Sequence, residues 1–293
     1  MNEVIARQAT MGQELESSIR EIGIPPRPAI LIRVSEEARS DDPNFNRLAD
    51  IIGRDVGLSA GMIKTANSPF YGYRQKCRSV REALIMLGLQ STVNTVAGLV
   101  MRRIFPPQYQ LERFWDASER TAEVSGWLVQ QLGIRFGIRA EDAYTFGLFR
   151  DCGIPIMMRR FSGYQGILAR ANENDTHAFT DVEQAEVPTN HALVGSLMTQ
   201  SWWLPEITTV AVRYHHDLAA LSAPVVEVGG ASLRLIVLAQ LAEKIVQDMT
   251  GLNRTREWEK LGSACLNNLE LNEDDYLRLS DDAKVFIATL PPL

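Results

Sequence analysis

The chain lacks the features of a disulfide framework, a zinc ribbon or a secreted protein. Its 293 residues include only three cysteines, which are far apart and form no Cys-x-x-Cys pair: Cys77, Cys152 and Cys265. An odd and scattered set of thiols argues against structural disulfides and suits a reducing compartment. The first 23 residues mix charged and apolar side chains throughout, so they do not resemble a signal peptide.

An excess of basic residues and a long apolar run are also missing. Lysine and arginine number 30 against 36 acidic residues, which gives a net charge of −6. Phosphate backbones attract dense basic surfaces, so this balance argues against general nucleic-acid binding. The longest strongly apolar run, Leu235 to Ala239, is far shorter than the roughly 20 residues that span a bilayer. We therefore expect a cytoplasmic protein that is not embedded in a membrane.

Strand signals are scarce, because alternating β-branched runs bounded by turn residues are nearly absent. Apolar residues recur instead at three- and four-residue spacings, which predicts an all-α protein. Asp42 and Pro43 predict the start of one helix, as its N-cap and first residue. Helices are predicted at about 3–22, 29–40, 43–53, 58–66, 79–88, 91–105, 111–132, 140–149, 154–161, 163–173, 179–187, 190–202, 205–216, 231–250, 255–268 and 281–289.

The double proline Pro106-Pro107 is the best candidate for a boundary within the chain, because proline ends the helix before it. We expect two lobes, an N-terminal helical subdomain at 1–105 and a second helical subdomain, with the C-terminal helices, at 106–293.

Several short phrases, taken in order, resemble the HDOD domain, a helical bacterial signalling module related to the HD-type phosphohydrolases. The resemblance covers about residues 20–250. The phrases are IPPRP (24–28), ADIIGRDVGL (49–58), ANSPFYG (66–72), SVREALIMLG (79–88), GLFRDCG (147–153), HALVG (191–195), WLPEI (203–207) and YHH (214–216). The resemblance implies a two-lobed helical module whose second lobe is HD-like.

The enzymes among the HD relatives cleave phosphate esters with one or two divalent metals. A histidine, a His-Asp pair, further histidines and a distal aspartate hold these metals, which neutralise phosphate and lower the pKa of an attacking water. When these ligand positions are carried over to this chain, Ala117 stands where the first histidine is expected and Arg150 stands where the histidine of the His-Asp pair is expected. The distal aspartate would fall near Gln240. Three of the expected ligands are therefore missing.

The residues that the resemblance leaves in ligand positions are Asp151, His191 and one of His215 and His216. Adjacent residues on a helix point about 100° apart, so we expect only one of the last two to face the pocket. We also expect the guanidinium of Arg150 to pair with Asp151 and to occupy part of the former metal site. These five residues form the predicted remnant pocket, with no catalytic residue and no cofactor. If the protein is instead a metal-dependent phosphohydrolase, we expect Asp151, His191 and His215 to be the ligands of a divalent Mn, Fe, Zn or Mg ion.

A local basic cluster follows the second short helix of residues 47–72. It comprises Arg74, Lys76, Arg78 and Arg81, close to Asn67. Such a cluster could bind an anionic ligand or an acidic partner surface. The alternative is that these are ordinary charged side chains of a loop, exposed to solvent and without a binding role.

We therefore expect a non-catalytic bacterial signal-transduction protein that binds a separate signalling protein or a small, nucleotide-like anionic ligand. The alternative is a metal-dependent phosphohydrolase, acting on cyclic dinucleotides or nucleotides through a rearranged metal site. Nucleic acid and membrane are not expected partners, and a homodimer is compatible with the sequence.

Overall fold

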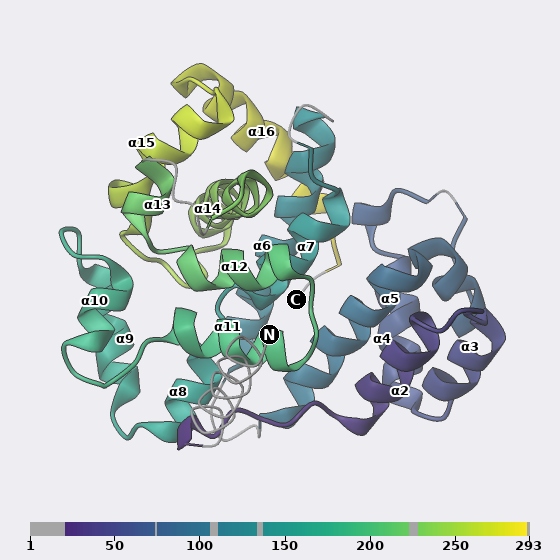
Figure 1. The fold of residues 1–293 in the computed structure, drawn as a ribbon. Coiled ribbons are helices and arrows are strands. Elements are labelled where there is room, and N and C mark those ends of the chain that lie inside the picture. The colour runs from purple at the N-terminus through teal and green to yellow at the C-terminus, as the bar shows by residue number, and fades with distance from the viewer. Residues whose placement is uncertain (1–20, 74, 106–110, 134–136, 223–227, 292–293) are drawn as a thin grey trace, which may run out of the picture.

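The computed structural model describes residues 21–73, 75–105, 111–133, 137–222 and 228–291, and every regular element within them is a helix (Figure 1). The all-α prediction is therefore confirmed. The predicted helix at 3–22 lies almost wholly outside the described residues, as do Arg74 and the Pro106-Pro107 pair. The elements are α2 (Ala29–Ala38), α3 (Phe45–Gly53), α4 (Val56–Ala66), η1 (Pro69–Tyr71), α5 (Val80–Ile104), α6 (Glu112–Leu132), α7 (Ala140–Phe149), α8 (Ile154–Arg160), α9 (Tyr164–Glu173), α10 (Phe179–Gln184), α11 (His191–Ser201), α12 (Glu206–Tyr214), α13 (Leu218–Ser222), α14 (Gly230–Thr250), α15 (Glu257–Leu269) and α16 (Glu273–Thr289).

Side-chain caps fix the starts of α3 and α4. The side chain of Asn44 accepts hydrogen bonds from the backbone N–H groups of the first turn of α3, so the predicted start at Asp42-Pro43 is wrong by two residues. Asn44 supplies the acceptor that the free N–H groups of a helix start require, in the way predicted for Asp42. Asp55 caps α4 at Leu58 N, and its carboxylate also binds the guanidinium of Arg103 on α5.

Helix α5 is interrupted at Gly88, whose φ of 75° and ψ of 174° are not helical. The sequence predicts this break, and glycine is the residue that adopts a positive φ without strain. Length and composition alone would let α5 cross a membrane, but 67% of its most apolar window is buried inside the protein. That burial is typical of a core helix.

Helix α14 forms the centre of the C-terminal half and contacts α6, α7, α12 and α15 (Figure 1). Its middle is buried on nearly all sides, as expected because residues 235–242 are all apolar except Gln240. The helices α2 to α5 lie together on the other side of the molecule, where α5 packs on α2, α3 and α4. The division at residue 105 stays a prediction.

Residues on both sides of α2 bind α8 and the end of α11. Arg159 of α8 donates a hydrogen bond to Gly23 O. The indole N–H of Trp202, at the end of α11, donates to Pro25 O at 3.0 Å, and the guanidinium of Arg39 donates to Trp203 O at 3.0 Å. One apolar cluster accordingly runs from α2–α5 into α8, α9 and α11.

The turn between α7 and α8 lies directly against the start of α11. A Cβ atom at Gly153 would overlap the carbonyl oxygen of His191 and come within 2.8 Å of the backbone N of Gly195. Glycine at this position lets the two backbones approach, and the approach brings Asp151 next to His191.

Candidate functional site

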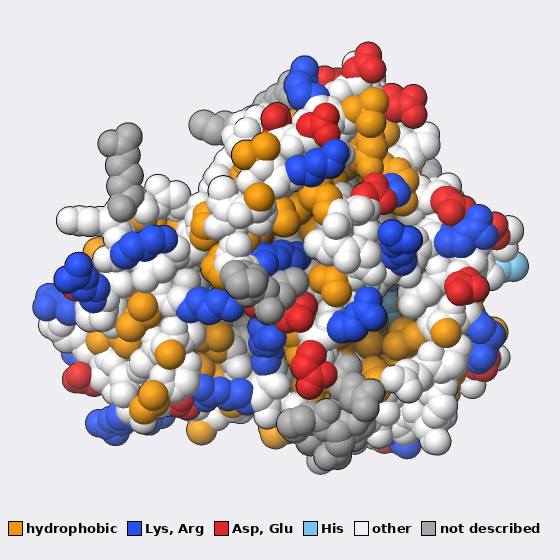
Figure 2. All heavy atoms as spheres, turned by 180° about the vertical axis from the view of Figure 1, so that it is seen from behind, with side chains coloured by type: hydrophobic (Ala, Val, Ile, Leu, Met, Phe, Trp, Pro, Cys, Tyr) orange, Lys and Arg blue, Asp and Glu red, His pale blue; other side chains and the backbone are white. Residues whose placement is uncertain are grey.

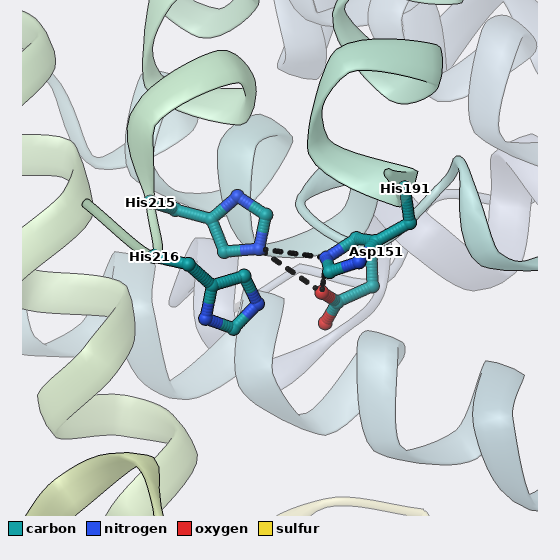
Figure 3. Close-up of side chains that lie close together, drawn as sticks. All are labelled: Asp151, His191, His215 and His216. Atoms are coloured by element: carbon teal, nitrogen blue, oxygen red, sulfur yellow. Dashed lines mark hydrogen bonds and ion pairs between the residues drawn. The ribbon is translucent and has the colours of Figure 1, made fainter. Parts of the chain in front are cut away.

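A cluster of four side chains lies where α7, α11 and α12 meet. Asp151 follows the end of α7, His191 is the first residue of α11, and His215 and His216 follow the last residue of α12. Asp151 and His191 reach in from one side, and the two adjacent histidines reach in from the other (Figure 3). One possible ligand atom from each residue lies within 4.8 Å of those from the other three.

The expectation that only one of His215 and His216 faces this cluster is wrong. That argument assumed helical geometry, but α12 ends at Tyr214, and the two histidines form the C-cap and the turn that follows. Both imidazoles are buried, with ring centroids 4.1 Å apart. The helix predicted at 205–216 therefore extends two residues too far at its C-terminal end, and those two residues belong to the site.

Each histidine has an acceptor at Nδ1. His191 Nδ1 lies 2.8 Å from Glu183 Oε2, His215 Nδ1 lies 2.8 Å from Val212 O, and His216 Nδ1 lies 2.6 Å from Glu257 Oε2. An acceptor at Nδ1 fixes the tautomer and the ring orientation and makes the opposite nitrogen available. This leaves the Nε2 atoms as the ligand atoms that each ring can offer.

The Nε2 atoms of His191 and His215 converge on one carboxylate oxygen. They lie 3.3 Å from each other, and 3.5 Å and 3.2 Å respectively from Asp151 Oδ1. Donors about 2.0–2.1 Å from a metal are about 3.3 Å apart when arranged tetrahedrally around it. The spacing and the chemistry of this donor set therefore fit a divalent cation, and the four residues could hold one.

The other oxygen of Asp151 binds the guanidinium of Arg150, whose Nε and Nη2 donate to Asp151 Oδ2 at 3.1 and 3.0 Å. Nη2 also donates to Glu243 on α14. The Arg150 side chain is 5% exposed, and its charge therefore lies buried between two carboxylates. Gln240, the position near which the distal aspartate was expected, donates to Glu243 Oε2 at 3.2 Å.

Burial and neighbouring charge set opposite protonation states for two of the histidines. Burial disfavours the charged form of His191, but the carboxylates of Glu183 and Asp151 outweigh it and raise its pKa to about 10. Burial and the neighbouring His216 lower the pKa of His215 to about 3. Without a metal, His191 is therefore charged and His215 neutral, and a proton lies where a cation would bind.

The pKa values of the buried carboxyl groups in this centre are shifted in opposite directions. Burial opposes ionisation of Asp151, but the guanidinium of Arg150 and the two histidines outweigh it and hold its pKa well below the usual range. Burial raises the pKa of Glu243 against the opposing charge of Arg150, and raises that of Glu257 against Lys260.

Sequence reasoning missed three acidic residues of the site, Glu183, Glu243 and Glu257. Glu243 lies one helical turn after Gln240, so a search of the helix face rather than one position would have found it. Glu183 and Glu257 carry no local signal, because only the tertiary fold brings them to Nδ1 of a histidine. Cys152 is buried, as expected for an inert thiol, and burial raises its pKa.

Two residues of the predicted basic surface, Asn67 and Lys76, make hydrogen bonds that hold the loop itself together. The side-chain amide of Asn67 both donates to and accepts from the backbone of Cys77, at 2.9 and 2.8 Å. Lys76 donates to Asn67 O at 2.8 Å. Lys76, Arg78 and Arg81 are exposed.

A cavity of about 200 Å³ opens beside the histidine cluster. Arg150, Asp151, His216, Glu243 and Glu257 are among the residues that line it. Its other walls come from the start of α6 and from α8, α9, α10 and the segment between α14 and α15.

The HDOD domain model matches residues 24–218 of the chain. An uncharacterized protein of Treponema pallidum (strain Nichols) is 26% identical over an alignment of 204 residues, and the match covers 67% of this chain and 38% of that protein. The match therefore spans well under half the length of this curated relative.

Solved structures of similar fold come from several bacteria. An HDOD domain protein of unknown function from Geobacter sulfurreducens is 18% identical, with a TM-score of 0.61 over 97% of this chain and 96% of its own. A protein of Shewanella amazonensis provisionally named a phosphohydrolase is 16% identical, with a TM-score of 0.67 over 92% and 94%. A protein of Marinobacter aquaeolei provisionally named a signal transduction protein is 18% identical, with a TM-score of 0.62 over 92% and 60%. At these identities the likeness is one of fold.

Proposed function

Because this chain belongs to the HDOD family, we propose that it is a signal-transduction protein that acts by binding and does not hydrolyse phosphate esters. Its partner is a separate signalling protein in the cytoplasm or a small ligand. The exposed side chains of Lys76, Arg78 and Arg81 are the surface we propose for an acidic partner.

The observation that carries this proposal is the burial of the Arg150 guanidinium between Asp151 and Glu243. A two-metal phosphohydrolase needs cations at such carboxylates, because the cations neutralise phosphate and lower the pKa of a water. A guanidinium neutralises carboxylates equally well, but it stays protonated and neither binds nor activates a nucleophile. Arg150 therefore supplies the charge of a cation without its chemistry.

A second candidate, a phosphohydrolase with one metal, is supported by the convergence of His191, His215 and His216 on Asp151. Histidine nitrogen with one carboxylate suits Zn, Fe or Mn better than Mg. Such an ion, when bound, would lower the pKa of a water and polarise a phosphoryl oxygen. The chain's own contribution would be the hydrogen bonds from Nδ1 that hold each imidazole in place. Both candidates share one feature: each is an HDOD protein whose histidine cluster could hold a metal.

Metal content and hydrolysis distinguish the two. Untagged protein is purified without chelators, incubated with Mn²⁺, Fe²⁺ or Zn²⁺, desalted and measured by mass spectrometry. The same samples are assayed with bis(p-nitrophenyl) phosphate and with cyclic dinucleotides. We expect no turnover above that of the metal salts, whether or not the four-residue cluster retains an ion.

Asp151→Asn is the matched control, because it keeps the shape of the side chain and removes its charge. Turnover in the parent protein that Asp151→Asn abolishes would establish the phosphohydrolase and overturn the proposal.

A further inference from the structure

Helix α16 carries apolar side chains on two faces, and only one of these faces is turned into the protein. Leu279 and Ala283 are buried on the inner face. Leu277 and Val285, which lie on another side of the helix, are 56% and 70% exposed. Large apolar side chains gathered on an exposed side of a helix indicate a site for another protein chain.

The exposed side of α16 forms one wall of a groove, and α14 forms the other wall. The groove has a volume of about 640 Å³, and α14 contributes Ile245, Asp248 and Met249 to it. A groove between two helices is a surface that a third, amphipathic helix can fill. At the top of Figure 2, over the region of α15 and α16, apolar side chains lie between acidic and basic ones.

Four of the residues that α16 contributes to the groove form one row along the helix: Leu277, Asp281, Lys284 and Ala288. Their spacings of four, three and four residues are those of the contact positions in a pair of packed helices. The two ends of the row are apolar, and its two central residues carry opposite charges. Asp281 and Lys284 bind each other at 2.7 Å but remain 73% and 63% exposed, so both charges are accessible to a partner.

An antiparallel copy of this row complements it at each of the four positions. With a two-fold axis between Asp281 and Lys284, Asp281 of each copy faces Lys284 of the other. Leu277 of each copy then faces Ala288 of the other, a large side chain against a small one. A two-fold interface uses the same patch on both subunits and therefore requires a patch that is complementary to itself.

We propose that a second copy of this chain occupies the groove, so that α16 of each copy lies against α14 and α16 of the other. The four helices then form a small antiparallel bundle between the two copies. Charged residues at two contact positions fix the register of such a pair and reduce its affinity. The symmetry of the row favours a copy of the same chain over a different protein, which would need no such symmetry.

Sedimentation equilibrium of the full chain tests for the dimer, because self-association depends on concentration. The monomer has a mass of 32.8 kDa. The average mass should rise toward twice that value between about 1 and 300 μM protein. A mass equal to that of the monomer at every concentration would overturn the proposal and leave the groove to a different protein.

Two charge changes test the register of the contact. Asp281→Lys makes both central charges positive and Lys284→Asp makes both negative, so like charges face each other across the axis. Each variant alone should associate at least about tenfold more weakly than the parent. An equimolar mixture of the two variants should associate again, because a positive row then faces a negative one. The pair within each helix stays broken in the mixture, so recovery reports contact between chains.

Glu259→Lys is the matched control, because it makes the same change of charge at an exposed ion pair outside the groove, the pair of Glu259 with Arg256. It should leave self-association unchanged, and circular dichroism should show the parent's helix content in every variant. Single variants that associate as well as the parent, a mixture that stays monomeric, or an equal loss in Glu259→Lys would each overturn the inference.

Discussion

The buried charge of Arg150 makes a prediction about stability that is independent of any ligand. Arg150→Met keeps much of the volume of the side chain but leaves Asp151 and Glu243 without the guanidinium that now lies between them. Removing one partner of a buried ion pair is strongly destabilising, because the remaining charge is left in a site of low polarity.

The expected loss is about 3–5 kcal/mol in the free energy of unfolding. For a chain of 293 residues that corresponds to a fall in Tm of roughly 5–8 °C. Adding Glu243→Gln removes the carboxylate that depends most on Arg150, because Asp151 still has His191 and His215 beside it. The double variant should recover about 2–3 kcal/mol of the loss, a coupling energy typical of groups in contact.

Urea denaturation followed by circular dichroism at 222 nm measures all four proteins of the cycle. Arg120, which pairs with Glu123 in a second buried ion pair, provides the matched control. Arg120→Met should also destabilise the protein, but it should be additive with Glu243→Gln. A stable Arg150→Met variant, or strict additivity between Arg150→Met and Glu243→Gln, would refute the proposed role of Arg150.

Three further predictions concern single positions. Glu183→Gln removes the main charge that raises the pKa of His191, so that pKa should fall from about 10, as measured by NMR titration of the imidazole signals. In the parent, the same raised pKa stabilises the fold below pH 6.5 and loses that contribution as the pH rises through 10. Gly153→Ala forces the α7–α8 turn away from α11 and should cost about 1–3 kcal/mol in thermal unfolding, whereas an unchanged Tm would contradict the close approach. Asp55→Ala should cost about 1 kcal/mol through the lost cap of α4, and Asp55→Asn, which keeps the cap, should lose less. The hydrogen bond from Arg103 helps to lower the pKa of Asp55 to about 2. The parent should therefore have a higher free energy of unfolding than Asp55→Asn above pH 4, and this difference should disappear as the pH falls through 2.

The helices were predictable where the sequence carries its own start and stop signals. Gly133 ends α6 and Gly88 interrupts α5, as the sequence predicts, because glycine adopts the positive φ that each position requires. The short helix α13 and the first turns of α16 were missed. Residues 273–282 are mostly acidic and polar, so their apolar spacing is too sparse to predict a helix. Their start depends instead on the capping box of Asn272 and Asp275.

The site was predictable only where the chain keeps a recognisable pattern. Asp151, His191 and the adjacent histidines stand in phrases shared with a known family, whereas Glu183 and Glu257 lie outside those phrases. Nothing local distinguishes Glu183 from Glu186, which instead binds Arg170 at the surface. The difference arises from tertiary packing, because α10 turns Glu183 toward Tyr164 and His191. Orientation of the histidines therefore required the structure.

The buried carboxylates of the centre are largely neutralised by the chain's own groups. Four carboxylates lie in it, those of Asp151, Glu183, Glu243 and Glu257, and Arg150 and Lys260 neutralise two of them. A proton on His191, whose pKa is about 10, neutralises a third. Burial raises the pKa of both Glu243 and Glu257, which favours the neutral form of each carboxyl. A guanidinium, an ammonium and the proton of His191 thus neutralise three of the four carboxylates, and an ion that binds the histidines must first displace the proton of His191.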